Sequence, residues 1–370
     1  MNEKFDIEET KAYFGPLYDY VSDDSITDVD VAGMPPEVWI TGSDNERVRV
    51  DDCQISTAFL EQFSKRVANT VSLPFNKAEP VLEAETDRLR ITVVHESAAI
   101  NGRAICIRKS LPYVRLKEED MIKSGYAKRE VINLLKNCVK ARMNLVFCGE
   151  PAAGKTECAK FFSSFIPANE RVITIEDTPE WHYSLINPDK DCVELKVGEQ
   201  MDYTRAIKTC LRLNPKWMML SETRSKEVIY LVEGFSTGVR GMTTLHTDDV
   251  RKVPDRMVNM AGQSRDEGRM ENDIYSFINV AVMIRRREVT DENNERVVRR
   301  YIDQVCFFDR KDGQNNTIMM VDDGRLINET LPEDARIKME RAGIKDPFCY
   351  EMPPEKHIRL TISTDTAKAG

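Results

Sequence analysis

Short runs of alternating apolar and polar residues dominate the first part of the chain. Alternation marks four segments between Ser25 and about Lys109, and a fifth has apolar residues at helical spacing. A period of two is typical of strands with one buried face, whereas spacings of three and four are typical of an amphipathic helix. Strands are expected at residues 26–33, 37–42, 89–96 and 104–110, and the helix at residues 56–71. This pattern predicts a small α+β domain, to which we assign residues 1–112.

The regular pattern lapses after Ser110. Residues 111–130 carry many charges and lack a regular apolar spacing, which is typical of a segment between domains. We therefore place a linker at residues 113–126, and we expect the second domain to begin at Ala127.

Helix and strand patterns alternate in the second domain. Residues 131–139 have the apolar spacing of one helix face, and the apolar run 144–149 follows directly. Helices are then expected at residues 155–166, 201–213 and 225–235, each followed by a strand, at residues 171–176, 217–220 and 241–245. Such alternation predicts an α/β fold with a mostly parallel sheet covered by helices.

The pattern changes again after Val280. Three hairpin-like strands are expected at residues 280–289, 296–308 and 317–326, and we place the end of the α/β domain at residue 330. Residues 331–370 form a polar tail with one short helix candidate, residues 332–343. The sequence assigns no role to this tail.

Composition narrows the class of protein. The 370 residues are 41% hydrophobic and 31% charged, which is typical of a globular protein. No apolar run approaches the roughly 20 residues of a membrane-spanning helix, and the acidic start does not resemble a signal peptide. We therefore expect a cytoplasmic protein whose membrane contacts are peripheral. The net charge of −9 disfavours direct binding to nucleic acid.

Metal and disulfide scaffolds are also disfavoured. The nine cysteines include no C-x-x-C pair, and the chain has only four histidines. This count excludes a zinc ribbon and makes a disulfide framework improbable as an organising feature.

The segment GEPAAGKT, residues 149–156, matches the phosphate-binding pattern G-x-x-x-x-G-K-[ST] at every fixed position. It lies between an expected strand and an expected helix, where backbone N–H groups can cradle phosphates. Lys155 would add a positive charge, and the Thr156 hydroxyl would bind Mg²⁺. A glycine-rich turn without a ligand is the alternative. The expected ATP-binding residues are Gly149, Glu150, Pro151, Ala152, Ala153, Gly154, Lys155, Thr156 and Glu157.

Acidic residues end two of the expected strands. Glu176 and Asp177 follow the run VITI, and Glu222 follows WMMLS. Ligands of parallel α/β sheets lie beyond the carboxyl ends of the strands, so these acids are expected near the phosphates. Solvated strand ends or helix caps are the alternative. His246 ends a further strand. A lone histidine is more often a packed or surface residue than a catalytic one, so spacing alone does not select His246 as a site residue.

In order, GEPAAGKT, ITIEDTPEW, LRLNPKWMMLSETR and STGVRGMTTLHT resemble the Walker A, aspartate box, Walker B and histidine box of the type II and type IV secretion traffic ATPases. The segments GPLYDYVSDDSITDVDVAG, RLRI and INGRAICIRKSLP resemble the first domain of that family. They are most similar to its Flp (Tad) pilus and conjugative-transfer branches. The resemblance covers about residues 12 to 310.

This resemblance implies a RecA-like P-loop domain and a homohexamer that holds ATP and Mg²⁺ between the two domains of each chain. It implies Glu176 as the carboxylate that activates water, and Glu222 as the Walker B acid and a metal ligand. His246 would sense the γ-phosphate. Arg90 and Arg108 would stabilise charge from the first domain, with a solvated strand face as the alternative. The implied partners are inner-membrane platform or secretion-channel proteins, and the implied function is a motor for pilus assembly or secretion.

Two positions depart from the family pattern. Val239 replaces the usual histidine after threonine and glycine in the histidine box, and Lys216 replaces the usual aspartate before the Walker B strand. Three other functions stay open: a nucleic-acid translocase or helicase, an ATP-binding scaffold that does not hydrolyse, and a small-molecule kinase. The acidic composition speaks against a helicase, and the presence of both Glu176 and Glu222 speaks against a scaffold.

Overall fold

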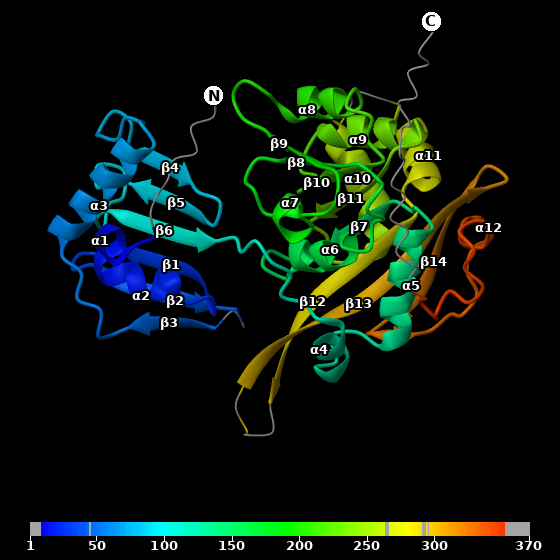
Figure 1. Ribbon diagram of the computed structural model, residues 1–370, viewed down its shortest axis with the longest axis horizontal. Coiled ribbons are helices and arrows are strands. Elements are labelled where there is room, and N and C mark those ends of the chain that lie inside the picture. Colours follow the sequence, from blue (N-terminus) through cyan, green and yellow to red (C-terminus); the bar gives the residue numbers. More distant parts are fainter. Residues whose placement is uncertain (1–8, 44–45, 263–265, 291–293, 295, 352–370) are drawn as a thin grey trace, which may run out of the picture.

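The computed structural model describes residues 9–43, 46–262, 266–290, 294 and 296–351. They form two sheets, one with six strands and one with nine. Each sheet belongs to a separate lobe, and an extended segment after the first sheet joins the two lobes (Figure 1). None of the helices in the described part of the chain has the length and hydrophobicity of a membrane-spanning segment.

The amino-terminal sheet is antiparallel, in the order β3-β2-β1-β6-β5-β4. Its inward side chains alternate with outward ones, as in β5, where Leu89, Ile91 and Val93 are buried and Arg90 is on the opposite face. The strands are β1 Ile26–Ala32, β2 Glu37–Gly42, β3 Arg47–Val50, β4 Val81–Glu85, β5 Leu89–Val94 and β6 Ala104–Lys109.

Short helices and one long helix supply the rest of this domain's core. The long helix α3, Thr57–Thr70, begins after the N-cap Ser56, whose hydroxyl accepts from the Phe59 N–H at 3.1 Å. Phe63 of α3 is fully buried. The shorter helices are α1 Lys11–Phe14, η1 Gly15–Leu17 and α2 Tyr18–Ser22. All of them contribute to the apolar cluster that contains Ile91 and Ile107 of the sheet, whereas Arg90 and Arg108 lie on the opposite face of their strands.

Part of the predicted linker is folded onto the second domain. Helix α4, Glu118–Lys123, lies inside it, and Met121 and Tyr126 are buried in the core of the second domain. The Tyr126 carbonyl accepts from the Ile302 N–H at 2.7 Å. The extended connection between the lobes is therefore shorter than residues 113–126.

The second sheet combines parallel and antiparallel strands, in the order β15-β14-β13-β12-β7-β11-β10-β8-β9. All pairs from β12 to β9 are parallel, whereas β12 to β15 pair antiparallel. The strands are β7 Leu145–Cys148, β8 Val172–Glu176, β9 Cys192–Lys196, β10 Trp217–Leu220, β11 Arg240–Leu245, β12 Val280–Thr290, β13 Arg296–Lys311, β14 Gln314–Asp322 and β15 Arg325–Leu326.

Helices cover both faces of the parallel part of the sheet. In β7, Leu145 and Phe147 belong to one apolar cluster, and Val146 and Cys148 belong to another. A strand buried on both faces has such a continuous apolar sequence. The first cluster includes α5 Arg129–Lys140, α6 Lys155–Ser163 and α12 Glu333–Arg341; the second includes α8 Tyr203–Cys210, α9 Glu227–Ser236, α10 Val253–Ala261 and α11 Glu267–Phe277.

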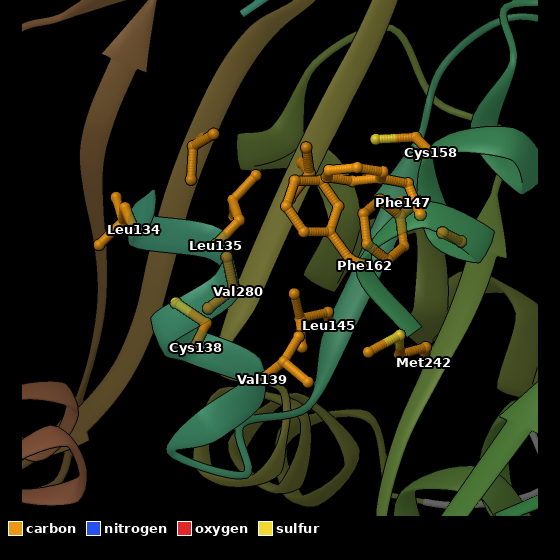
Figure 2. Packing of buried hydrophobic residues seen from close by; sticks show 14 of the residues in the cluster. Leu134, Leu135, Cys138, Val139, Leu145, Phe147, Cys158, Phe162, Met242 and Val280 are labelled. Carbon is orange, nitrogen blue, oxygen red and sulfur yellow. The ribbon is translucent and has the colours of Figure 1, made fainter. Parts of the chain in front are cut away.

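Helix α5 anchors the first cluster. Figure 2 shows its Leu135 and Val139 pointing toward Phe147, Phe162 and Leu145. Phe147 and Phe162 stack with ring centroids 6.0 Å apart. This packing fixes α6 against β7, and therefore fixes the loop that joins them.

The first half of the polar tail is part of the second domain. Met339 of α12 is buried, and the Asn137 amide on α5 donates to the carbonyls of Pro347 and Cys349 at 2.9 and 3.0 Å. Residues 331–351 therefore pack on the second domain. Residues 352–370 lie outside the described part of the chain.

Candidate active site

The loop between β7 and α6 has the backbone conformation that its glycines permit. Gly149 has φ of 148°, and a Cβ at this position would lie 2.3 Å from the Ile284 carbonyl oxygen. Gly154 is left-handed, with φ of 92°, and forms the N-cap of α6. No side chain caps the first turn of α6, so its N–H groups point toward the loop as an anion site requires.

Lys155 is the first residue of α6, and its side chain contacts this loop. Its amine donates to the carbonyls of Gly149 and Glu150 at 3.3 and 3.0 Å and lies 3.3 Å from Nδ1 of His246. Burial lowers the pKa of the Lys155 amine from its ordinary value. The carboxylate of Glu222 opposes this shift, so the two groups interact across the cavity.

Glu222 follows β10 and contacts two other side chains, His246 after β11 and Arg224. Its Oε1 lies 3.0 Å from Nε2 of His246, and its Oε2 lies 2.8 Å from a guanidinium nitrogen of Arg224. Nδ1 of His246 lies 3.1 Å from the Gly149 carbonyl. The histidine at the end of β11 therefore bridges the phosphate loop and the acid of β10. Arg224 also contacts Asp177 at 2.9 Å, and its bond to Glu222 raises the pKa of Arg224.

Glu176 does not reach the cavity. Its side chain is buried, and its Oε2 accepts from the backbone N–H groups of Glu180 and Trp181 at 2.7 and 3.0 Å. Burial raises the pKa of the Glu176 carboxyl to about 8. The prediction that Glu176 faces the phosphates is therefore wrong in this structure, because the loop after β8 turns back over the carboxylate.

Glu180 lies where Glu176 was expected. Its Oε2 accepts from the Thr156 hydroxyl at 3.1 Å. Glu180 and Asp177 both line the cavity, whereas Glu176 does not. The aspartate box thus supplies two cavity carboxylates from its loop, and the last residue of the strand holds that loop in shape.

Both domains line one cavity of about 450 Å³ around these groups. The amino-terminal domain contributes Arg90 and Arg108 from neighbouring strands, β5 and β6. Nε of Arg108 donates to Asp28 at 2.7 Å, and this bond raises the pKa of Arg108. The structure therefore places both predicted arginines opposite the phosphate loop.

Positively charged side chains that were not predicted from the sequence also line the cavity. Arg300 of β13 approaches the loop, since its Cδ lies 3.2 Å from the position of a Cβ on Gly154. Its Nη1 donates to the Ser43 carbonyl of the other domain at 2.6 Å. Eight Lys or Arg and five Asp or Glu side chains line the cavity, so the cavity carries an excess of positive charge that suits a polyanion.

The oxygen donors in the cavity suit Mg²⁺ bound together with phosphates. The donors are the Thr156 hydroxyl and the carboxylates of Asp177, Glu180 and Glu222. No group of three or more His, Cys, Asp or Glu that could hold a metal occurs among the described residues. Mg²⁺ commonly binds through few protein ligands, with phosphate and water oxygens completing its octahedron, so this donor set fits the ion.

The family model for type II/IV secretion system proteins matches residues 81–332, more than half of the chain. The chain belongs to this family. An uncharacterized protein of Bacillus anthracis is 29% identical over 282 residues, 74% of this chain and 63% of that protein. The type IV secretion system protein VirB11 of Bartonella quintana is 28% identical over 182 residues, 46% of this chain and 50% of VirB11. The chain thus matches between half and two thirds of the length of these relatives.

A solved structure of the pilus retraction motor PilT with bound ADP has the same fold. It aligns with a TM-score of 0.57 and 15% identity, over 88% of this chain and 85% of that chain.

The two departures from the pattern of the type II/IV secretion family lie away from the cavity. Lys216 precedes β10 and Val239 precedes β11, at the amino ends of these strands. Neither lines the cavity, which lies at the carboxyl ends. Lys216 is exposed, and Val239 packs against the second apolar cluster. These substitutions therefore leave the geometry around Glu222 and His246 intact.

Proposed function

We propose that this chain is a magnesium-dependent ATPase that powers a secretion or pilus-assembly machine. One observation carries the proposal: the phosphate loop, Glu222 and two arginines of the other domain line a single cavity. Phosphoryl transfer needs positive charge around the transferred group and a carboxylate that positions the attacking water. The cavity offers both kinds of group, from two domains that can approach or separate.

The phosphates of ATP would bind at the N-terminus of α6. Backbone N–H groups of the phosphate loop and of the first turn of α6, together with the Lys155 amine, would neutralise their charge. Mg²⁺, when bound, reduces the negative charge on the phosphate oxygens, and Thr156 and Glu222 are the residues that would hold it. His246 contacts both the loop and Glu222, so it can respond to the γ-phosphate by exchanging these contacts.

We assign the orientation of the attacking water to Glu180 rather than Glu176. Glu180 contacts Thr156 and lines the cavity. Glu176 is buried behind the loop, and its raised pKa keeps it protonated near neutral pH. A general base must lie within hydrogen-bond reach of the water that it activates, and Glu180 already borders the cavity in which that water would lie.

Arg90 and Arg108 would stabilise the charge that develops on the transferred phosphoryl group. An arginine that arrives only when two domains close can accelerate hydrolysis by roughly 10³ to 10⁵. Domain closure would therefore gate turnover, and hydrolysis would in turn release the domains. This cycle is a physical route from ATP turnover to mechanical movement.

We further propose that the second domain is a RecA-like motor domain and that the chain works as a homohexamer. It would act at the cytoplasmic face of a membrane, on inner-membrane platform or secretion-channel proteins. Membership of the secretion family and the fold shared with a pilus retraction motor support this assignment. This proposed action on membrane proteins requires no direct contact between the chain and nucleic acid.

The test is ATP hydrolysis by the purified chain, with and without Mg²⁺, together with the mass of the oligomer in each nucleotide state. Lys155→Ala should abolish turnover, and Lys65→Ala, an exposed lysine on α3, is the matched control. A hexamer that binds ATP without hydrolysis would favour a scaffold. Hydrolysis that survives Lys155→Ala would overturn the assignment of the site.

A further inference from the structure

Two polar side chains of the second domain hold the residues that follow β6. The Lys160 amine on α6 donates to the Leu111 carbonyl at 3.2 Å. Nε2 of His182 lies 2.8 Å from the Ser110 hydroxyl. Lys160 and His182 are only 2% and 5% exposed. We call these two contacts, with their four residues, the β6 clamp.

The β6 clamp connects the nucleotide site to the amino-terminal domain. Lys160 belongs to the helix that begins with Lys155, and His182 ends the loop that contains Glu180. Both segments border the cavity, and both contact the chain at Ser110 and Leu111. Arg108 lies two residues before Ser110, on β6.

Apolar packing alone does not account for Lys160. A buried amine costs free energy unless its hydrogen bonds compensate, and an apolar side chain of similar size would fill the same space. The amine is satisfied by the Leu111 carbonyl and by Glu157 at 3.1 Å. The other Glu157 oxygen accepts from the Arg115 N–H at 3.4 Å. The first turns of α6 thus bind the connecting segment at two places.

Apolar packing alone does not account for His182 either. Its backbone is left-handed, with φ of 46° and ψ of 40°, a conformation that costs free energy for a residue other than glycine. Burial and the nearby Lys160 lower the pKa of the ring to about 4, so the ring is neutral when it meets the Ser110 hydroxyl. The same loop contacts the amino-terminal domain again through Thr178, whose hydroxyl donates to Glu85 at 3.0 Å.

We propose that Lys160 and His182 are positioning residues for Arg108. By fixing Ser110 and Leu111, they set where β6 ends relative to the phosphate loop, and they transmit movements of α6 and of residues 177–182 to the amino-terminal domain. The inference rests on the proposed ATPase function. Lys160 and Ser110 border the cavity, but the Lys160 amine is already bound by the Leu111 carbonyl and Glu157. We therefore expect the β6 clamp to affect turnover through Arg108 and not through nucleotide binding.

A double-mutant cycle tests this route. Lys160→Met keeps the length of the side chain and removes its donor. We expect it to lower kcat about tenfold and to leave the Kd for ATP within about twofold. Combined with Arg108→Ala, it should add little further loss, because coupled residues act non-additively. Additive losses in the cycle would contradict the inference.

The matched control is Lys190→Met. The Lys190 amine donates to the carbonyls of Ser164 and Ile166 at 2.6 and 2.8 Å, so it is also a sheltered lysine bound to backbone oxygens. These contacts lie within the second domain. Lys190→Met should lower stability without lowering kcat. An equal loss of kcat in Lys190→Met and Lys160→Met would show that the β6 clamp acts only by stabilising the fold.

Ser110→Ala provides a second, milder variant in case Lys160→Met does not fold. It removes the partner of His182 and changes no strained backbone, and it should lower kcat in the same non-additive manner with Arg108→Ala. Unchanged kcat in both Lys160→Met and Ser110→Ala, with an active wild type, would overturn the inference and leave the ATPase function standing.

Amide hydrogen exchange separates the inference from the function on which it rests. Residues 104–111 should exchange faster in Lys160→Met than in wild type, whether or not ATP is hydrolysed, and should stay unchanged in Lys190→Met. Unchanged exchange in Lys160→Met would contradict the β6 clamp directly. Absence of hydrolysis by wild type would contradict only the proposed ATPase.

Discussion

Glu176 and Glu180 lie four residues apart, yet only Glu180 borders the cavity that both domains line. Glu180→Gln should therefore lower turnover by about a hundredfold, the usual contribution of a positioned general base, while ATP still binds. Glu176→Gln is the matched variant. It keeps an oxygen for the loop N–H groups, and we expect at most a few-fold loss of turnover. Single-turnover hydrolysis and ATP titration of both variants check this.

The reverse result would return the role to Glu176. If Glu176→Gln loses turnover and Glu180→Gln does not, the loop after β8 must rearrange when nucleotide binds. The hydrogen bond between Thr156 and Glu180 would then belong to a resting conformation only.

Glu176 should also make stability depend on pH. Burial raises its pKa to about 8, so between about pH 4.5 and pH 8 the native chain holds a proton that the unfolded chain has released. The protonated Glu176 carboxyl therefore contributes fully to the stability of the folded chain below the pKa of the unfolded chain, and this contribution is lost as the pH rises through about 8. The free energy of unfolding of wild type relative to Glu176→Gln should therefore decrease from about pH 5 to pH 8. Urea titrations of both proteins at several pH values measure this difference in unfolding free energy. A difference that does not change with pH would contradict the raised pKa of Glu176.

Sequence reasoning reached some of the cavity residues and not others, for physical reasons. The phosphate loop, Glu222 and His246 end or follow strands of the parallel sheet, and the edge that they share is predictable from the alternation of elements. The position of Glu176 at the end of a strand does not predict that the following loop folds back and covers its carboxylate. Arg300 comes from an antiparallel strand about half the chain length away from Arg90 and Arg108, and only the three-dimensional packing brings it to Gly154.

At the scale of elements, α5 anchors both the central sheet and the segment after α12. Asn137 is buried and donates to two carbonyls of that segment. Asn137→Ala should lower the free energy of unfolding by about 1–3 kcal/mol, because two buried acceptors lose their donor. Chemical denaturation measures the loss, and proteolysis after residue 345 should become faster. Asn133→Ala, which removes a single bond to Phe348, should have a smaller effect.

The elements that the sequence predicted are those with strong apolar patterns. Strands β7, β8 and β10 are buried on both faces, and such runs are conspicuous in the sequence. The edge strand β9 was missed because its side chains are only partly buried or exposed. Helix α11 was missed because only Met270 and Ile274 are buried. Helix α4 was assigned to a linker because three acidic residues begin it.

At the scale of the whole molecule, the cavity depends on how the two domains meet. Several contacts between them are polar: Lys196 pairs with Glu85 at 2.5 Å, and Arg300 binds the Ser43 carbonyl. Polar contacts of this kind can exchange for others at modest cost. The arrangement therefore suits domains that close on nucleotide and open after hydrolysis.

The most direct test of this account is ATP turnover by Arg108→Ala. Arg49→Ala is the control, because Arg49 lies on the same sheet and pairs with Glu37 and Asp51 outside the cavity. The account predicts that Arg108→Ala lowers kcat by roughly 10³ or more with little change in ATP affinity, and that Arg49→Ala behaves as wild type. Equal kcat for all three proteins would contradict a catalytic site completed by the amino-terminal domain.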